Sequence, residues 1–104
     1  MKEFYIGDFS PYCGLFPELS QIQLKVFVMY SYSVSPNRIA IELNITVNTF
    51  YSYIKIIKSK YNVKSSSELR NIFYVRKDFY LLNMLHQYTQ LHISKNHTDG
   101  GATR

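Results

Sequence analysis

The segment from Asn44 to Ser67 has the side chains needed to bind a polyanion. It contains four lysines and no aspartate or glutamate. A lysine ammonium group donates hydrogen bonds to phosphate oxygens and to the O6 and N7 atoms of guanine. A carboxylate in the same place would repel a phosphate. This segment is therefore a candidate surface for nucleic acid.

The positive charge of the chain is concentrated around this segment. The formal net charge is +5, and residues 35–77 carry eight basic and two acidic side chains, whereas the two flanking segments are close to neutral. A localised basic surface suits a polyanion, although an ordinary solvated face would have the same composition. Arg70, Arg76 and Lys77 fit a solvated face better than direct contact with nucleic acid.

Capping residues predict where the helices that carry these side chains begin. Ser20 with Gln23 forms a capping box. Ser35 precedes Pro36, which suits the first position of a helix, and Thr46 supplies the next cap. The predicted helices are 21–30, 36–43, 46–61 and one that begins near 66.

The predicted helix ends follow the same logic. Asn44 and Asn62 come directly after the second and third helices, where a left-handed residue often ends a helix. Ser65 with Glu68 gives a second capping box. The fourth helix then continues or restarts, and its apolar spacing reaches about Ile93.

We predict an all-α fold, a four-helix helix-turn-helix bundle with an extended C-terminal helix. A short helix, a tight turn at 44–46 and a longer helix make up the helix-turn-helix pattern, whose second helix enters the major groove of DNA. Residues 1–18 are expected to be an irregular arm with aromatic anchors, and residues 94–104 a flexible tail, which leaves 19–93 as the domain. The first helix is expected to bury one face, formed by Ile22, Val26, Phe27 and Tyr30.

The order of residues between Leu19 and Leu69 matches a known pattern. The matching residues are Leu19-Ser20, Val26-Phe27, Ser35, Ile39-Ala40 with Leu43, Ile45-Thr46 with Thr49-Phe50, Ile57 with Lys60-Tyr61, Val63 and Leu69. This stretch, about half of the chain, resembles the LuxR/GerE-type helix-turn-helix DNA-binding domain. It departs from the family at Ile22-Gln23, where the family has Arg-Glu, at Ser33, where it has Gly, and at Tyr53, where it has His.

The resemblance implies a transcription regulator whose partner is double-stranded DNA, with helix 46–61 in the major groove. The residues expected to read base edges are Asn48, Tyr51, Ser52 and Lys55. The residues expected to hold the phosphate backbone are Ser35, Asn37, Thr46 and Lys58. An amide, a hydroxyl and an ammonium group are suited to these contacts, because each can donate a hydrogen bond to a base edge or a phosphate.

Apolar residues recur every three positions near the end of the fourth helix. They are Phe79, Leu82, Leu85 and Tyr88, followed by Leu91. This part of the helix either folds back onto its own domain or associates with a second copy. Helix-turn-helix modules commonly dimerise to read two half-sites, so we expect a homodimer.

A second hypothesis is that the chain is a diverged module that binds another regulator or RNA polymerase and no longer reads DNA. The lost family charges and the aromatic-rich C-terminal helix favour it. The acid-free third helix, with Lys55, Lys58 and Lys60, favours DNA binding.

Other kinds of chemistry lack the residues they need. His86 and His92 lie six positions apart, on different sides of a helix, with no cysteine or carboxylate beside them, so we expect no metal site. The sequence has no glycine-rich phosphate loop, no paired carboxylates and no Ser/His/Asp set. We therefore expect no enzymatic activity, no cofactor and no small-molecule ligand.

Length and cysteine content set the broad class. A chain of 104 residues with 46% hydrophobic residues is typical of one globular domain. Cys13 is the single cysteine, which rules out an intrachain disulfide and suits a reducing compartment. No apolar stretch is long enough to span a bilayer. We expect a cytoplasmic protein with no membrane partner.

Overall fold

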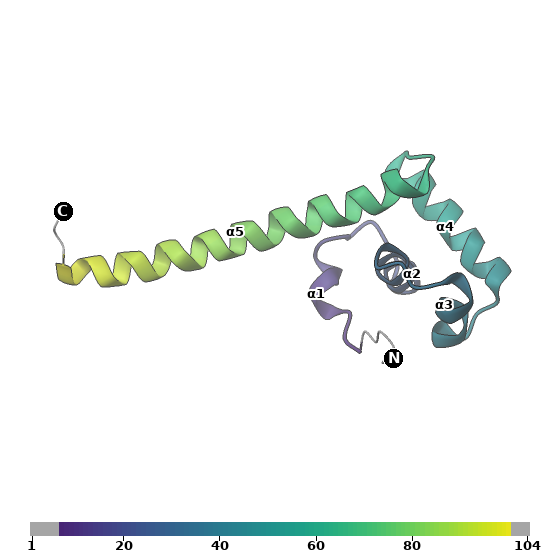
Figure 1. Cartoon of the computed structure of the whole chain (residues 1–104), viewed down its shortest axis with the longest axis horizontal. Coiled ribbons are helices and arrows are strands. Elements are labelled where there is room, and N and C mark those ends of the chain that lie inside the picture. Colours follow the sequence, from purple (N-terminus) through teal and green to yellow (C-terminus); the bar gives the residue numbers. More distant parts are fainter. Residues whose placement is uncertain (1–6, 101–104) are drawn as a thin grey trace.

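The computed structural model describes residues 7–100, with side chains described up to residue 91, and this part of the chain is all-α. Its five helices are α1 (Ser10–Cys13), α2 (Gln21–Ser31), α3 (Pro36–Leu43), α4 (Val47–Tyr61) and α5 (Ser66–Gly100). Figure 1 shows the first four helices gathered at one end, with α5 leaving them as a long straight rod. The predicted all-α class and extended C-terminal helix are confirmed.

The predicted caps are present. The Ser20 hydroxyl accepts a hydrogen bond from the Gln23 backbone N–H at 3.3 Å, and the Gln23 carboxamide accepts one from the Ser20 N–H at 3.1 Å. Ser35 caps α3 and Thr46 caps α4 in the same manner. Each cap satisfies a backbone N–H that has no partner inside its own helix. Local residue types therefore fix where these helices begin.

Both predicted left-handed ends are also present. Asn44 has a φ of 58° and Asn62 a φ of 56°. After Asn44, the Ile45 N–H donates to the Ala40 carbonyl at 2.9 Å, which is the hydrogen bond of a Schellman motif that spans five positions. α2 is also followed by a left-handed residue, Ser33, which has a φ of 66°. Serine is not a residue type that predicts this conformation, as asparagine and glycine do.

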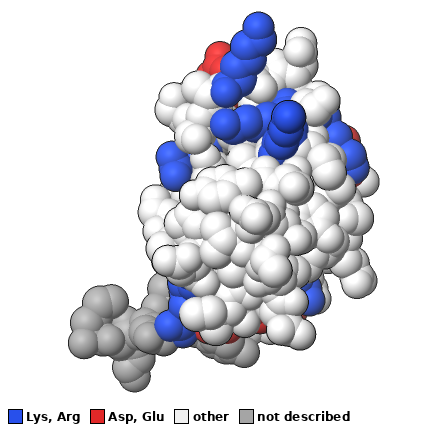
Figure 2. Space-filling view, turned by 90° about the vertical axis from the view of Figure 1, so that its right-hand side faces the viewer, with Lys and Arg blue, Asp and Glu red and all other residues white. Residues whose placement is uncertain are grey.

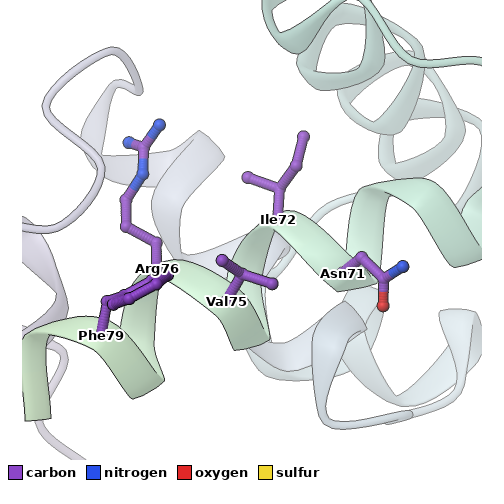
Figure 3. A pocket seen from close by; sticks show the side chains of 5 residues that line it. All are labelled: Asn71, Ile72, Val75, Arg76 and Phe79. Carbon is purple, nitrogen blue, oxygen red and sulfur yellow. The ribbon is translucent and has the colours of Figure 1, made fainter. Parts of the chain in front are cut away.

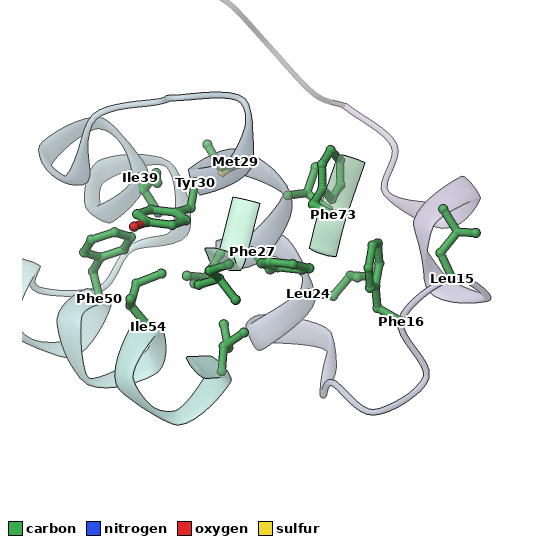
Figure 4. Close-up of a cluster of buried hydrophobic side chains, with 14 residues drawn as sticks. Leu15, Phe16, Leu24, Phe27, Met29, Tyr30, Ile39, Phe50, Ile54 and Phe73 are labelled. Carbon is green, nitrogen blue, oxygen red and sulfur yellow. The ribbon is translucent and has the colours of Figure 1, made fainter. Parts of the chain in front are cut away.

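The hydrophobic core is built around α2, which contacts α1, α3, α4 and α5. Every residue from Val26 to Ser31 is buried, and so is Leu24. The sequence predicted burial on one face of this helix only, whereas residues on all sides of its second half are buried. Ile22, which belongs to the predicted face, is only half-buried. The reason is that neighbours cover α2 on several sides, as the side chains in Figure 4 show.

The N-terminal arm is part of this core. Phe16 is buried, with its ring edge-on to Phe27 at 5.0 Å and stacked on Phe73 at 5.7 Å. The Tyr12 ring of α1 is also stacked on Phe73, with the ring centroids 5.9 Å apart. The expected anchoring role of the arm holds for Phe16. Phe9, another expected anchor, is half-buried and packs against the core, whereas the expected anchors Phe4 and Tyr5 lie outside the described residues.

α5 is one continuous helix that leaves the domain. The helix begins at the predicted Ser65–Glu68 capping box and runs to Gly100 without a restart. The backbone is therefore helical up to Gly100, where the sequence predicted a flexible tail from 94, and residues 101–104 lie outside the description. Every residue from Asp78 to Leu91 is exposed, so the predicted alternative in which this part folds back is wrong. In the described part of the chain, no helix has the length and hydropathy needed to cross a membrane.

Candidate nucleic-acid interface

The four residues predicted to read bases lie together on the outer side of α4. Asn48, Ser52 and Lys55 are spaced by four and three positions, which places them along one side of a helix. Tyr51 lies beside them, 55% exposed, and its ring packs edge-on against Phe50 at 5.0 Å. This packing holds the Tyr51 ring at its base and leaves its outer part open to solvent.

The predicted phosphate-binding residues lie at the starts of α3 and α4. Ser35, Asn37 and Thr46 are exposed, and Asn37 and Thr46 line the same hollow of about 720 Å³ beside the turn at 44–46. The two hydroxyl groups differ in what they can still donate. The Thr46 hydroxyl donates to the Thr49 hydroxyl at 2.9 Å, whereas the Ser35 hydroxyl accepts from Arg38 and keeps its own proton available.

The charge on this face is uneven. Figure 2 shows the side of the molecule that α4 covers, with Lys and Arg gathered toward the top, where α4 ends and α5 begins. A broad uncharged area lies below them. Among the described residues, the side chains of Lys55, Lys58 and Lys64 make no hydrogen bond or ion pair. These three lysines are the ones free to meet a phosphate.

Two other basic residues of the central segment are paired on the protein surface. Arg38 forms an ion pair with Glu42 one turn along α3, at 2.9 Å. Lys60 points away from the outer side of α4 and donates to the Glu18 carbonyl at 2.9 Å and to the Gln23 side chain at 2.8 Å. Lys60 therefore holds α4 to the start of α2. The sequence suggested that it supports DNA binding, but its ammonium group is already paired.

Three further basic residues, on α5, pack against aromatic rings. Arg70 lies over the Tyr30 ring at 4.6 Å, and Lys77 lies over a group of aromatic rings at 5.2 to 5.5 Å. Arg76 donates to the Leu15 carbonyl at 2.9 Å. All three are partly buried, so the prediction that they form a solvated face is wrong. They make cation–π contacts that join α5 to the rest of the domain.

A polar cluster around Glu18 fixes the end of α4 that carries the free lysines. The Glu18 carboxylate accepts a hydrogen bond from the Tyr61 hydroxyl at 2.9 Å and forms an ion pair with Arg76 at 3.0 Å. Burial acts to raise the pKa of Glu18, but hydrogen bonds to its own backbone, to Tyr61 and to Arg76 outweigh it, and the pKa is lowered. Burial, followed by the contact with Glu18, raises the pKa of Tyr61. No pattern in the sequence indicates this cluster, because Glu18 lies in the segment expected to be an irregular arm.

The Glu18 cluster predicts a loss of stability in acid. Because the folded-state pKa of Glu18 lies below its unfolded value of 4.5, its contribution is complete above that pH and is lost as the pH falls through the folded-state pKa. We expect Glu18→Gln to unfold at lower urea concentration than the wild type at pH 7, with the two midpoints converging toward pH 3. Urea titrations followed by circular dichroism between pH 3 and 7 would measure this. A midpoint difference that does not change with pH would contradict it.

Comparisons with known proteins do not assign this chain to a group. No family model, no curated protein and no solved structure matches it. Within the described residues, no three His, Cys, Asp or Glu side chains lie close enough together to share a metal ion.

Proposed function

We propose that the chain binds double-stranded DNA and regulates transcription, and that α3, the turn at 44–46 and α4 form a helix-turn-helix of the LuxR/GerE type. The observation that carries this proposal is the outer side of α4, where polar side chains and unpaired lysines lie together with no acidic residue between Asn44 and Ser67. Arg38, which is paired with Glu42, and the four basic residues that pack against the rest of the domain (Lys60, Arg70, Arg76 and Lys77) do not contribute to it. The proposal therefore depends on Lys55, Lys58 and Lys64.

The dimensions of α4 suit the major groove. The helix rises by 1.5 Å per residue, so Thr46 and Lys58 are about 18 Å apart along the axis, which is enough to span the groove width of about 12 Å. With the middle of α4 over the base pairs, Asn48, Ser52 and Lys55 reach base edges. Lys58 at one end and the start of α3 at the other then meet the phosphates of the two strands.

The test is binding of the full chain to a fluorescent pool of random duplex DNA, measured by anisotropy at several salt concentrations. Each lysine that neutralises a phosphate contributes about one unit to the slope of log affinity against log salt. We expect the Lys55→Ala/Lys58→Ala double variant to bind more weakly, with a slope smaller by about two.

A matched variant separates this surface from total charge. Lys25→Ala/Lys95→Ala removes the same net charge away from the outer side of α4, and we expect it to bind like the wild type. Equal weakening in both double variants would show that only the overall charge matters. No binding of the wild type at low salt would refute the proposal for this chain.

A protein-binding role has its own supporting observation. The middle of the outer surface is uncharged, and Ile41 on α3 is 75% exposed beside the hollow next to the turn. An apolar side chain this exposed is more useful to a protein partner, such as another regulator or RNA polymerase, than to a phosphate backbone. The two functions are separable, because replacing Ile41 with aspartate would abolish capture of a protein partner, whereas replacing Lys55 and Lys58 would weaken DNA binding.

A further inference from the structure

The outer side of α4 carries few groups suited to guanine. Arginine and lysine are the side chains that most often read this base, because they donate hydrogen bonds to its O6 and N7 atoms. No arginine occurs from Val47 to Tyr61. Lys60 is held at the start of α2, and Lys58 is assigned to a phosphate. Of the basic residues of α4, only Lys55 is therefore placed over the bases.

The three arginines in the described part of the chain are engaged elsewhere. Arg38 forms the ion pair on α3, and Arg70 lies over an aromatic ring. Arg76 lies beside a groove of about 460 Å³ on α5, where Figure 3 shows it with Ile72 and Phe79. Its guanidinium group donates to a carbonyl of the N-terminal arm. One α4 helix can therefore read at most one guanine through a charged group.

The start of α4 presents a carboxamide group that suits adenine. Asn48 is exposed, and its side chain has no hydrogen-bond partner among the described residues. An asparagine carboxamide accepts a hydrogen bond from adenine N6 and donates one to N7. In a helix-turn-helix, the residues at the start of the second helix contact the base edges. Asn48 is the second residue of α4 and occupies such a position.

Tyr51 adds an apolar surface beside Asn48. The two residues are three positions apart and are neighbours on the surface of the helix. The Tyr51 ring packs against the fully buried Phe50, and the outer part of the side chain remains exposed. The apolar feature that the major groove offers to such a ring is the C5 methyl group of thymine. The uncharged middle of this face in Figure 2 is suited to the same contact.

We propose that α4 selects A·T-rich DNA, with Asn48 on adenine, Tyr51 on a thymine methyl group and Lys55 on a single guanine. Asn48 and Tyr51 are about 4.5 Å apart along the helix axis, close to the spacing of about 3.4 Å between base pairs. The two side chains therefore reach neighbouring base pairs. This inference rests on the proposed function and names the class of DNA that the surface selects.

The first test is selection of bound sequences from a random pool of duplex DNA by the full chain, followed by sequencing. We expect A·T-rich sites with no more than one fixed G·C pair for each bound α4. Lys55→Ala should relax the preference at that G·C pair, and Asn48→Ala should relax it at an A·T pair. Selected sites rich in G·C pairs would overturn the inference and leave DNA binding itself intact.

The second test removes the methyl group from the DNA. In the selected duplex, each thymine in turn is replaced by uracil, which pairs in the same way and has the same charge but lacks the C5 methyl group. We expect the affinity to fall about fourfold at the thymine that Tyr51 contacts, which is the effect of burying one methyl group. Equal affinity for the thymine and uracil forms at every position would refute the contact.

Variants of exposed residues assign this effect to one side chain. Tyr51→Ala should bind the thymine and uracil duplexes equally. Tyr51→Phe keeps the ring and should keep the fourfold difference. If the hydroxyl group instead held a phosphate, Tyr51→Phe would bind both duplexes more weakly, which would contradict the inference. Ile56→Ala is a matched control that removes an exposed apolar side chain from the second half of α4 and should keep the difference.

The two proposals fail in different ways. If the wild type binds no duplex even at low salt, the proposed function and this inference are both wrong. If it binds duplex DNA with a steep salt dependence but shows no preference for A·T pairs or for thymine over uracil, only this inference is wrong. Circular dichroism of each variant shows whether the domain has kept its fold.

Discussion

Replacing Phe73 with alanine is expected to lower the free energy of unfolding by about 3–5 kcal/mol, as for other buried phenylalanines. Phe73 is fully buried on α5, and its ring contacts Phe16 and Phe27 at 5.7 Å and Tyr32 at 5.1 Å. It therefore joins α5 to α2 and to the N-terminal arm. Alanine would leave a cavity between three segments of the chain, and the loss of aromatic contacts adds to the loss of buried area.

Urea or thermal unfolding followed by circular dichroism measures this difference. Phe79→Ala is a matched control, because it removes the same side chain from the same helix, where it is 65% exposed. We expect the control to change the free energy of unfolding by no more than about 0.5 kcal/mol in a monomer. Similar losses in the two variants would mean that Phe73 is not the link between the segments.

Replacing Asn44 with valine is expected to lower the free energy of unfolding by about 2 kcal/mol. Asn44 ends α3 with a φ of 58°, a left-handed conformation that strains residues with a β carbon and most of all β-branched ones. Its side chain is exposed, so a loss of packing cannot explain a large effect. The strain would act on the turn that sets α4 against α3.

The comparison with Asn44→Gly isolates the backbone as the cause. Glycine adopts positive φ without strain, so we expect Asn44→Gly to unfold within about 0.5 kcal/mol of the wild type. Unfolding in urea at neutral pH would give both values. If valine and glycine had equal effects, the left-handed conformation at Asn44 would not be the source of the loss.

The features that the sequence predicted well depend on neighbouring residues. The cap at Ser20, the cap at Thr46 and the left-handed ends at Asn44 and Asn62 all involve hydrogen bonds within five positions along the chain. Such contacts follow from residue type and spacing alone. For the same reason, the exposure of Asn48, Ser52 and Lys55 on α4 was predictable from helical periodicity.

The features that it missed depend on segments far apart in the chain. Lys60 and Gln23 are 37 positions apart, and Arg76 and Leu15 are 61 positions apart. Nothing in the local pattern distinguishes these cations from the free lysines at 55 and 58. The burial of α2 on several sides was missed because a search for one apolar side assumes a single neighbouring layer. The candidate site is therefore smaller and less basic than the sequence count of charges suggested.

The long rod of α5 has a consequence for how the chain opens. One unbroken hydrogen-bonded helix extends to Gly100, but the described contacts with the other helices stop near Asp78. Beyond that point a lone helix must rely on its own propensity, which is modest for tyrosine, asparagine, histidine and threonine. The backbone amides on the two sides of Asp78 should thus exchange with solvent hydrogen at different rates, slowly in the first part and fast in the second. The cooperative folding unit ends in the middle of a helix.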